Sequence, residues 1–93
     1  MPQLSEAKIA TLIPTVPAWR VESGELTRTF GFPDFAASLA FVNRVGEAAE
    51  KAGHHPDIDI RYNRVRLALV THSDGGLTEK DFALAATIDA LLA

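Results

Sequence analysis

Three histidines are the side chains of this sequence best suited to proton transfer. The free histidine ring titrates close to neutrality, so it can act as an acid or as a base at physiological pH. His54 and His55 are neighbours in Gly53-His54-His55-Pro56, and His72 lies in Thr71-His72-Ser73. Joint action by the three rings requires a fold that brings these two segments together.

A predicted β-hairpin separates the two histidine segments. Hydrophobic residues alternate with polar ones over residues 58–62 and again over 65–69, as in strands with one buried face. We expect a two-residue loop at Asn63-Arg64, because Asn tolerates the left-handed backbone that tight loops need. That register, extended beyond the strands, places His55 opposite His72, with about 5 Å between their Cα atoms. The hairpin thus predicts that the histidines converge.

Two other kinds of site use the same residue types. Three imidazoles can bind zinc and leave an open catalytic position. Adjacent histidines on a short joint seldom point at one ion, however, and the sequence has no cysteine and no histidine pair at helical i, i+4 spacing. Ser38 and Ser73 lack the context of a serine nucleophile. Acid–base chemistry without a metal is the leading interpretation, and a zinc site is its alternative.

Caps and hydrophobic spacing predict the elements that hold these residues. Three helices are expected from their N-cap residues, which are Ser5, Asp34 and Thr78. Gly53 ends the long second helix, and Asp81 completes a capping box at the start of the third. Two hairpins supply four strands. The order α-β-β-α-β-β-α predicts an α+β fold, with one four-stranded antiparallel sheet and three helices on one face.

Length and composition restrict the class of protein. The chain has 93 residues, so we expect a single domain over 1–93. Its 47% hydrophobic content is high for so small an interior and favours a partner subunit, yet no apolar stretch approaches the ~20 residues of a membrane helix. Nine scattered basic residues against twelve acidic ones, a net charge of −3, argue against nucleic acid. The absence of cysteine and of a basic, then apolar, leader favours the cytoplasm.

The residues around the histidines resemble the signature of the pterin-4a-carbinolamine dehydratase family. The segments that carry the resemblance are Glu50-Lys51-Ala52-Gly53-His54-His55-Pro56-Asp57, Tyr62-Asn63, Thr71-His72, and Gly76-Leu77-Thr78 with Asp81. Trp19 and the aromatic residues of segment 30–35 extend it over nearly the whole chain. The resemblance implies a four-stranded antiparallel sheet in an α+β fold that pairs into homodimers and often homotetramers.

The resemblance also implies a reaction and a set of roles. The reaction is dehydration of 4a-hydroxytetrahydrobiopterin to quinonoid dihydrobiopterin, without metal or cofactor, which recycles the pterin after aromatic amino acid hydroxylation. His54 and His72 would be acid and base, and His55 would bind and orient the pterin. The further substrate-binding positions that match are Glu50, Pro56, Trp19 and Asp81. From the residues alone, Trp19 reads first as a core aromatic and Asp81 as a helix-start residue.

Three positions depart from the family pattern. Gly53 stands where an acidic residue is often found, Ile58 where an aromatic is common, and Lys80 where arginine is common. Lysine does not reproduce the planar bidentate contact of arginine, so pterin affinity could differ. A non-catalytic interaction module is the alternative function, because certain animal relatives act as dimerisation cofactors of a transcription factor.

Overall fold

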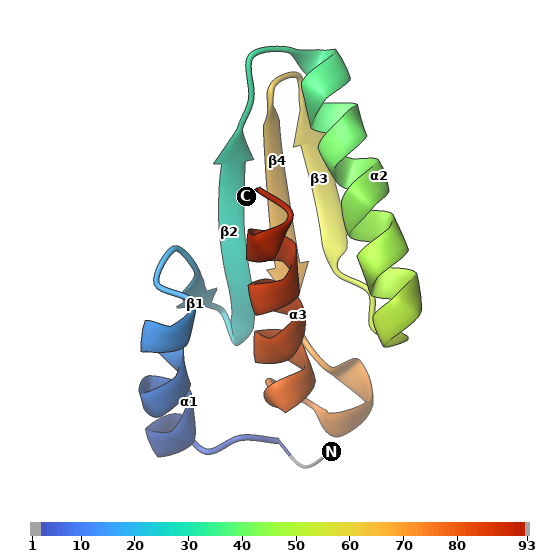
Figure 1. Cartoon of the computed structure of the whole chain (residues 1–93). Helices are drawn as coiled ribbons and strands as arrows, with labels where there is room; N and C mark the ends of the chain where they lie inside the picture. Colours follow the sequence, from blue (N-terminus) through green and yellow to red (C-terminus); the bar gives the residue numbers. More distant parts are fainter. Residues whose placement is uncertain (1–2, 93) are drawn as a thin grey trace.

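The computed structural model describes residues 3–92, which form two β-hairpins and three helices (Figure 1). The helices and strands are α1 (Glu6–Leu12), β1 (Arg20–Glu22), β2 (Glu25–Gly31), α2 (Phe35–Ala52), β3 (Asp57–Arg61), β4 (Arg64–Leu69) and α3 (Glu79–Ala90). Two 3₁₀ turns, η1 (Ile13–Thr15) and η2 (His72–Asp74), follow α1 and β4. The predicted α+β class and element order are confirmed.

The predicted caps set the ends of the helices. The Lys8 N–H donates to Ser5 Oγ at 3.1 Å at the start of α1, and the Ala37 N–H donates to Asp34 Oδ1 at 2.9 Å at the start of α2. Gly53 ends α2 in the left-handed conformation, with a φ of 63° that costs glycine little. The chain therefore leaves α2 directly before the two adjacent histidines.

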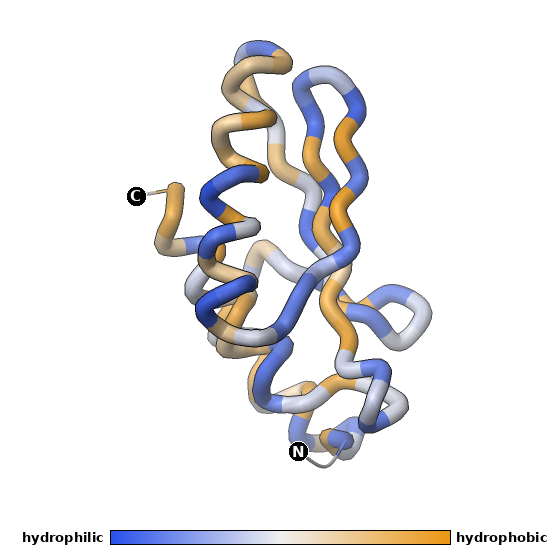
Figure 2. The backbone as a smooth tube through the Cα atoms, turned by 90° about the vertical axis from the view of Figure 1, so that its right-hand side faces the viewer, coloured by the Kyte–Doolittle hydropathy of each residue, from blue (hydrophilic) through white to orange (hydrophobic). Residues whose placement is uncertain are grey.

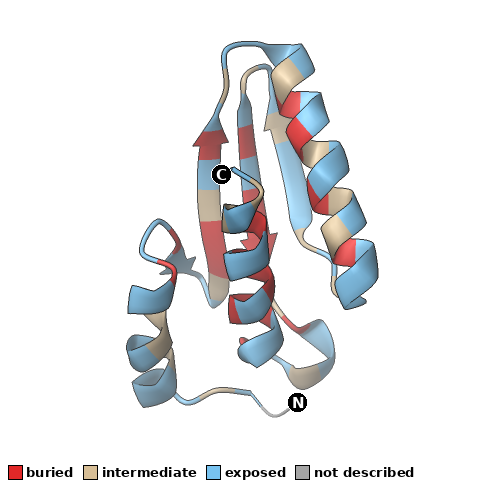
Figure 3. Cartoon of the chain, in the orientation of Figure 1, coloured by how far each residue is buried: buried red, intermediate tan, exposed pale blue. Residues whose placement is uncertain are grey.

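The four strands form one antiparallel sheet in the order β1-β2-β4-β3. Hydrophobic and hydrophilic residues alternate along the β3–β4 hairpin (Figure 2). Because neighbouring side chains of a strand point to opposite faces, the buried apolar residues share one face of the sheet. Helices α2 and α3 lie against that face, and the buried residues gather between the layers (Figure 3). The core includes Leu26, Phe30, Val65, Leu67 and Leu69 from the sheet and Phe41, Val45, Phe82, Ala85 and Ile88 from the helices.

The predicted register of the β3–β4 hairpin is wrong by two residues. The loop is Tyr62-Asn63, not Asn63-Arg64, and Ile58 faces Leu67, not Leu69. A shift of two keeps every side chain on its own face, so apolar still meets apolar and the hydrophobic pattern cannot distinguish the two registers. In the observed register, Asn63 makes hydrogen bonds to a residue outside the hairpin.

Those contacts join the loop to the end of the first hairpin. The Phe32 N–H donates to the Asn63 carbonyl at 2.9 Å, and Asn63 Nδ2 donates back to the Phe32 carbonyl at 3.1 Å. Tyr62 takes the positive φ, 49°, that the prediction gave to Asn63. The β3 ladder ends at Asp57, so the predicted ladder pairing of His55 with His72 is also wrong. Over residues 3–92, no helix combines the length and apolar character needed to cross a membrane.

Candidate active site

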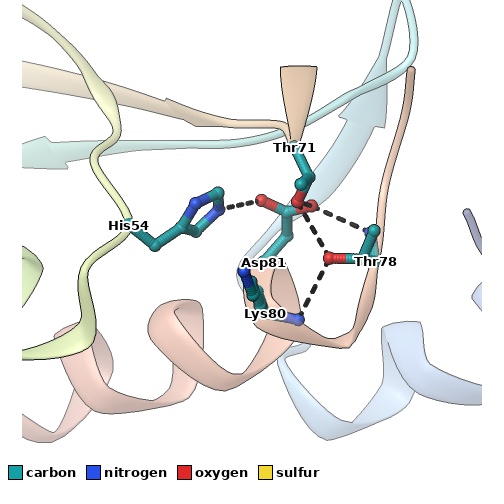
Figure 4. A network of polar contacts seen from close by, with 5 residues as sticks. All are labelled: His54, Thr71, Thr78, Lys80 and Asp81. Atoms are coloured by element: carbon teal, nitrogen blue, oxygen red, sulfur yellow. Dashed lines mark hydrogen bonds and ion pairs between the residues drawn. The ribbon is translucent and has the colours of Figure 1, made fainter. Parts of the chain in front are cut away.

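His54 leaves the end of α2 and turns toward the start of α3. Its backbone N–H donates to the Ala49 carbonyl at 3.2 Å, which ties the joint to the last turn of α2. Its ring Nε2 lies 2.5 Å from Oδ1 of Asp81 (Figure 4). The His54 side chain is 12% exposed and that of Asp81 is fully buried. This short contact is therefore shielded from water on the carboxylate side.

Asp81 belongs to the capping box of α3 and to the histidine site at once. Its Oδ2 accepts the backbone N–H of Thr78 at 2.9 Å, which is the capping-box contact predicted from the sequence. The same Oδ2 accepts the hydroxyl of Thr71, also at 2.9 Å. Both carboxylate oxygens are thus engaged within the chain. Asp81 acts on His54 in this structure, whereas the sequence suggested contact with the substrate, which stays a prediction.

His72 follows Thr71 directly and is held near the same network. Thr71 and Gly76 form a two-way backbone bridge, with the Thr71 N–H donating at 3.1 Å and the Gly76 N–H donating at 3.3 Å. The bridge closes the loop whose first exposed residue is His72. Since the Thr71 side chain binds the carboxylate that contacts His54, the segments of His54 and His72 meet through Asp81. The sequence predicted convergence through a ladder pairing of His55 with His72, whereas the contact between the two segments runs from His54 through Asp81 to Thr71.

His55 has a different environment from His54. Its Nε2 lies 2.5 Å from Oε2 of Glu50, in the last turn of α2, and both side chains are exposed, 60% for His55 and 79% for Glu50. Glu50 and His55 line a wide, shallow hollow of 790 Å³, while His54 and Lys80 line a smaller one of 170 Å³ with apolar walls. The two adjacent histidines therefore face different hollows of the surface.

The two remaining predicted substrate contacts lie in unlike places. Pro56 is half-buried directly after His55 and directly before β3. Trp19 is only 3% exposed, and its Nε1 donates to Asp89 Oδ1 at 2.8 Å. Asp89 lies eight residues after Asp81 on α3, about 12 Å along the axis. Trp19 is therefore placed in the core at the other end of that helix.

Sequence reasoning missed the part that Thr71 plays. It recognised Thr78 and Asp81 as a capping box, but nothing in the local pattern linked the segment after β4 to that box. The available signal was a threonine directly before a histidine, which many surface loops also contain. Within the described part of the chain, no three His, Cys, Asp or Glu side chains converge as metal ligands.

Comparison with known proteins assigns a family. The profile described as pterin 4 alpha carbinolamine dehydratase matches residues 2–91. A protein of Acidobacterium capsulatum, provisionally named a pterin-4-alpha-carbinolamine dehydratase, is 61% identical over 92 residues, which cover 99% of this chain and 100% of that one. A Chloroflexus aurantiacus protein of the same provisional name is 62% identical over 92 residues, 99% of each chain.

Solved structures agree with the sequence matches. A transcriptional coactivator/pterin dehydratase from Brucella melitensis superimposes with a TM-score of 0.92 at 32% identity, over 98% of this chain and 99% of that one. A pterin dehydratase-like protein, identified as a RuBisCO assembly factor in the alpha-carboxysome, gives a TM-score of 0.65 at 28% identity, over 78% and 84%. Sequence and fold together show that this chain belongs to the pterin 4 alpha carbinolamine dehydratase family.

Proposed function

We propose that this protein dehydrates 4a-hydroxytetrahydrobiopterin to quinonoid dihydrobiopterin and water. The observation that carries the proposal is the contact of His54 with the buried carboxylate of Asp81. The same carboxylate accepts the hydroxyl of Thr71, the residue directly before His72. Family membership supplies the class of reaction and substrate. A ring held this firmly, beside a second histidine, suits a reaction that needs only proton transfers.

The reaction breaks the C4a–O bond and forms a C4a=N5 double bond. An acid protonates the 4a-hydroxyl, and the N5 lone pair then expels it as water. A base then removes the N5 proton, so the loss of water is balanced and no electron acceptor is needed. His54 and His72 are the proposed acid and base. Each positioned group of this kind typically gives ~10²–10⁴-fold.

The neighbouring residues are proposed to bind and orient the pterin. His55 and Glu50 contact each other but are exposed at their hollow, where a ligand can reach both at the C-terminal end of α2. Pro56, half-buried directly after His55, is proposed to add an apolar contact. Asp81 serves in the proposal through His54, because its oxygens are already occupied. Substrate contact by Trp19 rests on the family resemblance, and its burial favours a core role.

We further propose a homodimer or homotetramer in the cytoplasm, acting beside an aromatic amino acid hydroxylase. Exposed apolar side chains support the assembly. Phe35 is 46% exposed and Leu39 40% on α2, and Ile58 is 40% exposed on the edge strand β3. Such residues on a helix face and an open sheet edge are suited to burial against a second copy.

A non-catalytic interaction module is the second candidate. The observation that favours it is the likeness in fold to a relative identified as an assembly factor and to one named a transcriptional coactivator. A stable protein partner, retained after His54, His55 and His72 are all replaced by alanine, would support this role. The three histidines themselves favour the enzyme, because a scaffold does not need them.

A stopped-flow assay with freshly prepared 4a-hydroxytetrahydrobiopterin tests the proposed reaction. Wild-type protein should accelerate the dehydration, and His54→Ala and His72→Ala should each lose about 10²-fold or more in kcat. Lys8→Ala, an exposed change on α1, is a matched surface control. Absence of acceleration by wild-type protein, or full activity in both histidine variants, would refute the proposal.

A further inference from the structure

We propose that Thr71 and Thr78 are positioning residues, whose hydroxyl groups pass hydrogen bonds in one direction into Asp81 and hold its carboxylate behind His54, where the carboxylate keeps the proton of the ring on Nε2. This leaves Nδ1 as the ring atom that exchanges a proton with the substrate. The inference deepens the proposed dehydratase function, and its last part rests on that function. The assignment of the proton to Nε2 stands on the contacts alone.

The contacts fix the direction of every hydrogen bond in this network (Figure 4). A backbone N–H can only donate, so Lys80 donates to Thr78 Oγ1 at 3.3 Å. A carboxylate only accepts, so the Thr71 hydroxyl donates to Asp81 Oδ2 at 2.9 Å. Thr71 has then used its one hydrogen. The 2.8 Å contact between the two hydroxyls must therefore run from Thr78 to Thr71.

The same reasoning sets the tautomer of His54. The carboxylate of Asp81 accepts at Oδ1, where the only neighbour in the network is His54 Nε2 at 2.5 Å. Nε2 must carry the hydrogen of that contact, and in the neutral ring Nδ1 then carries the lone pair. Within the described residues, no buried side-chain nitrogen or oxygen lacks a partner. With this assignment every contact of the Asp81 carboxylate has a donor.

Burial shows that the network is more than a helix cap. Thr78 and Asp81 have no exposed surface, and Thr71 is 4% exposed. A capping box needs the N-cap side chain and the N3 carboxylate, which are Thr78 and Asp81. The hydroxyl of Thr71 comes from the isolated bridge after β4, and the cap does not require it. A buried hydroxyl is costly unless it is bonded, so its target, the carboxylate behind His54, indicates its purpose.

Nuclear magnetic resonance of the full-length protein tests the proton assignment without any pterin. A strongly downfield imidazole N–H signal should belong to Nε2 of His54, persist in His55→Gln and His72→Gln, and vanish in His54→Gln. In Thr71→Val the carboxylate loses one donor and binds the remaining hydrogen more strongly, so this signal should move further downfield. Thr71→Ser should restore the wild-type position.

Thr27→Val is the matched control, because Thr27 is also buried, 2% exposed, and its hydroxyl also donates to a carboxylate, that of Glu22, at 2.7 Å. It should leave the His54 signal unchanged. A His54 proton on Nδ1 in wild-type protein, or the same signal in Thr71→Val as in wild type, would overturn the proposal. The wild-type tautomer decides the proton assignment even if the valine variant does not fold, and Thr71→Ser then tests the positioning role.

Kinetics with 4a-hydroxytetrahydrobiopterin test the functional part separately. Thr71→Val should lower kcat by about 10-fold to 100-fold with KM unchanged within about 2-fold, because the Asp81 carboxylate loses the hydroxyl that holds it in place and shifts together with the His54 ring bound to it, while substrate binding is kept. Thr71→Ser should recover most of this loss, and Thr27→Val should retain kcat. Unchanged kcat in Thr71→Val, with the shifted signal, would refute the positioning role and keep the tautomer. An inactive wild type would instead refute the proposed function.

Discussion

Two adjacent histidines make the same contact in opposite surroundings. His54 Nε2 and His55 Nε2 each lie 2.5 Å from a carboxylate oxygen, of Asp81 and Glu50 respectively. The first carboxylate is fully buried and the second is 79% exposed. Water and salt screen the exposed pair, whereas the buried pair interacts at a lower dielectric and has no alternative partner. Equal distances therefore do not mean equal constraint.

The difference suits two different tasks. A ring that must exchange a proton with a reacting atom benefits from a fixed position and a fixed tautomer, which His54 obtains from Asp81. A ring that must adapt to a ligand benefits from freedom, which the exposed His55 and Glu50 keep. One dipeptide thus supplies both properties, because Gly53 ends α2 immediately before it.

The largest predicted effect separates the two carboxylates. Asp81→Ala removes the acceptor of His54, of the Thr71 hydroxyl and of the Thr78 N–H, and should cost about 3 kcal/mol or more of unfolding free energy. Glu50→Ala should change that free energy by less than about 0.5 kcal/mol. Urea unfolding of both variants measures the difference. Equal losses would show that burial does not distinguish these pairs.

The turn between α2 and the histidines gives the next effect. Gly53→Ala forces a Cβ into a left-handed residue and should destabilise the fold by about 1–2 kcal/mol. Gly46→Ala, in the interior of α2 with open space around the added Cβ, should stabilise it by about 0.5–1 kcal/mol. Thermal unfolding of the two variants checks the opposite signs. A stabilising Gly53→Ala would contradict the conformational role of that glycine.

The third effect concerns Trp19, a predicted substrate contact that belongs to neither histidine–carboxylate pair. Trp19→Phe keeps a ring beside Phe30 but loses the hydrogen bond to Asp89, at a cost of about 1 kcal/mol. KM for the pterin should stay within about 2-fold of wild type, since Trp19 is buried at the far end of α3. Steady-state kinetics decides the point. A KM raised tenfold would restore Trp19 as a substrate contact.

The smallest effect concerns a third carboxylate, that of Glu22, which accepts a hydrogen bond from the hydroxyl of Thr27. The hydrogen bond from the Thr27 hydroxyl, and then the nearby Arg20 and Arg66, lower the pKa of Glu22 below its ordinary value of 4.5. A lowered folded-state pKa stabilises the fold above pH 4.5 and loses that contribution as pH falls through the folded value.

Thr27→Val should therefore bring the pKa of Glu22 closer to its ordinary value. The stability that the fold loses in acid because Glu22 becomes protonated should then be smaller. Unfolding followed between pH 5 and pH 3 should show a slightly shallower decline than in wild type, in the range set by the ordinary carboxylate value. An unchanged decline would mean that the arginines, rather than Thr27, hold Glu22.

Local signals explain what the sequence could predict. Ser5, Asp34, Gly53 and Thr78 mark helix ends through short-range hydrogen bonds and backbone preference, so each boundary followed from a few residues. The hairpin between the two histidine segments followed from the alternation of its residues. Its register did not, because parity is preserved by a shift of two and the contacts of Asn63 with Phe32 are long-range.

The same limit applies to the site. Asp81 was visible as a capping residue, and the family signature placed it near the histidines, but its contact with His54 depends on how α2 and α3 pack. Thr71 was less visible still, because its partner lies ten residues away across a loop. Side chains that act through another residue carry little signal in a single sequence.

A crystal structure of the protein with a bound, unreactive pterin tests the central claim most directly. The ring should lie where His54 Nδ1 and the His72 ring both reach the C4a–N5 edge at hydrogen-bond distance, with the Asp81–His54 contact retained. His55 should rotate to meet the pterin. A pterin bound elsewhere, or one that contacts His55 while His54 and His72 remain remote from C4a and N5, would contradict the assignment of His54 and His72 as acid and base.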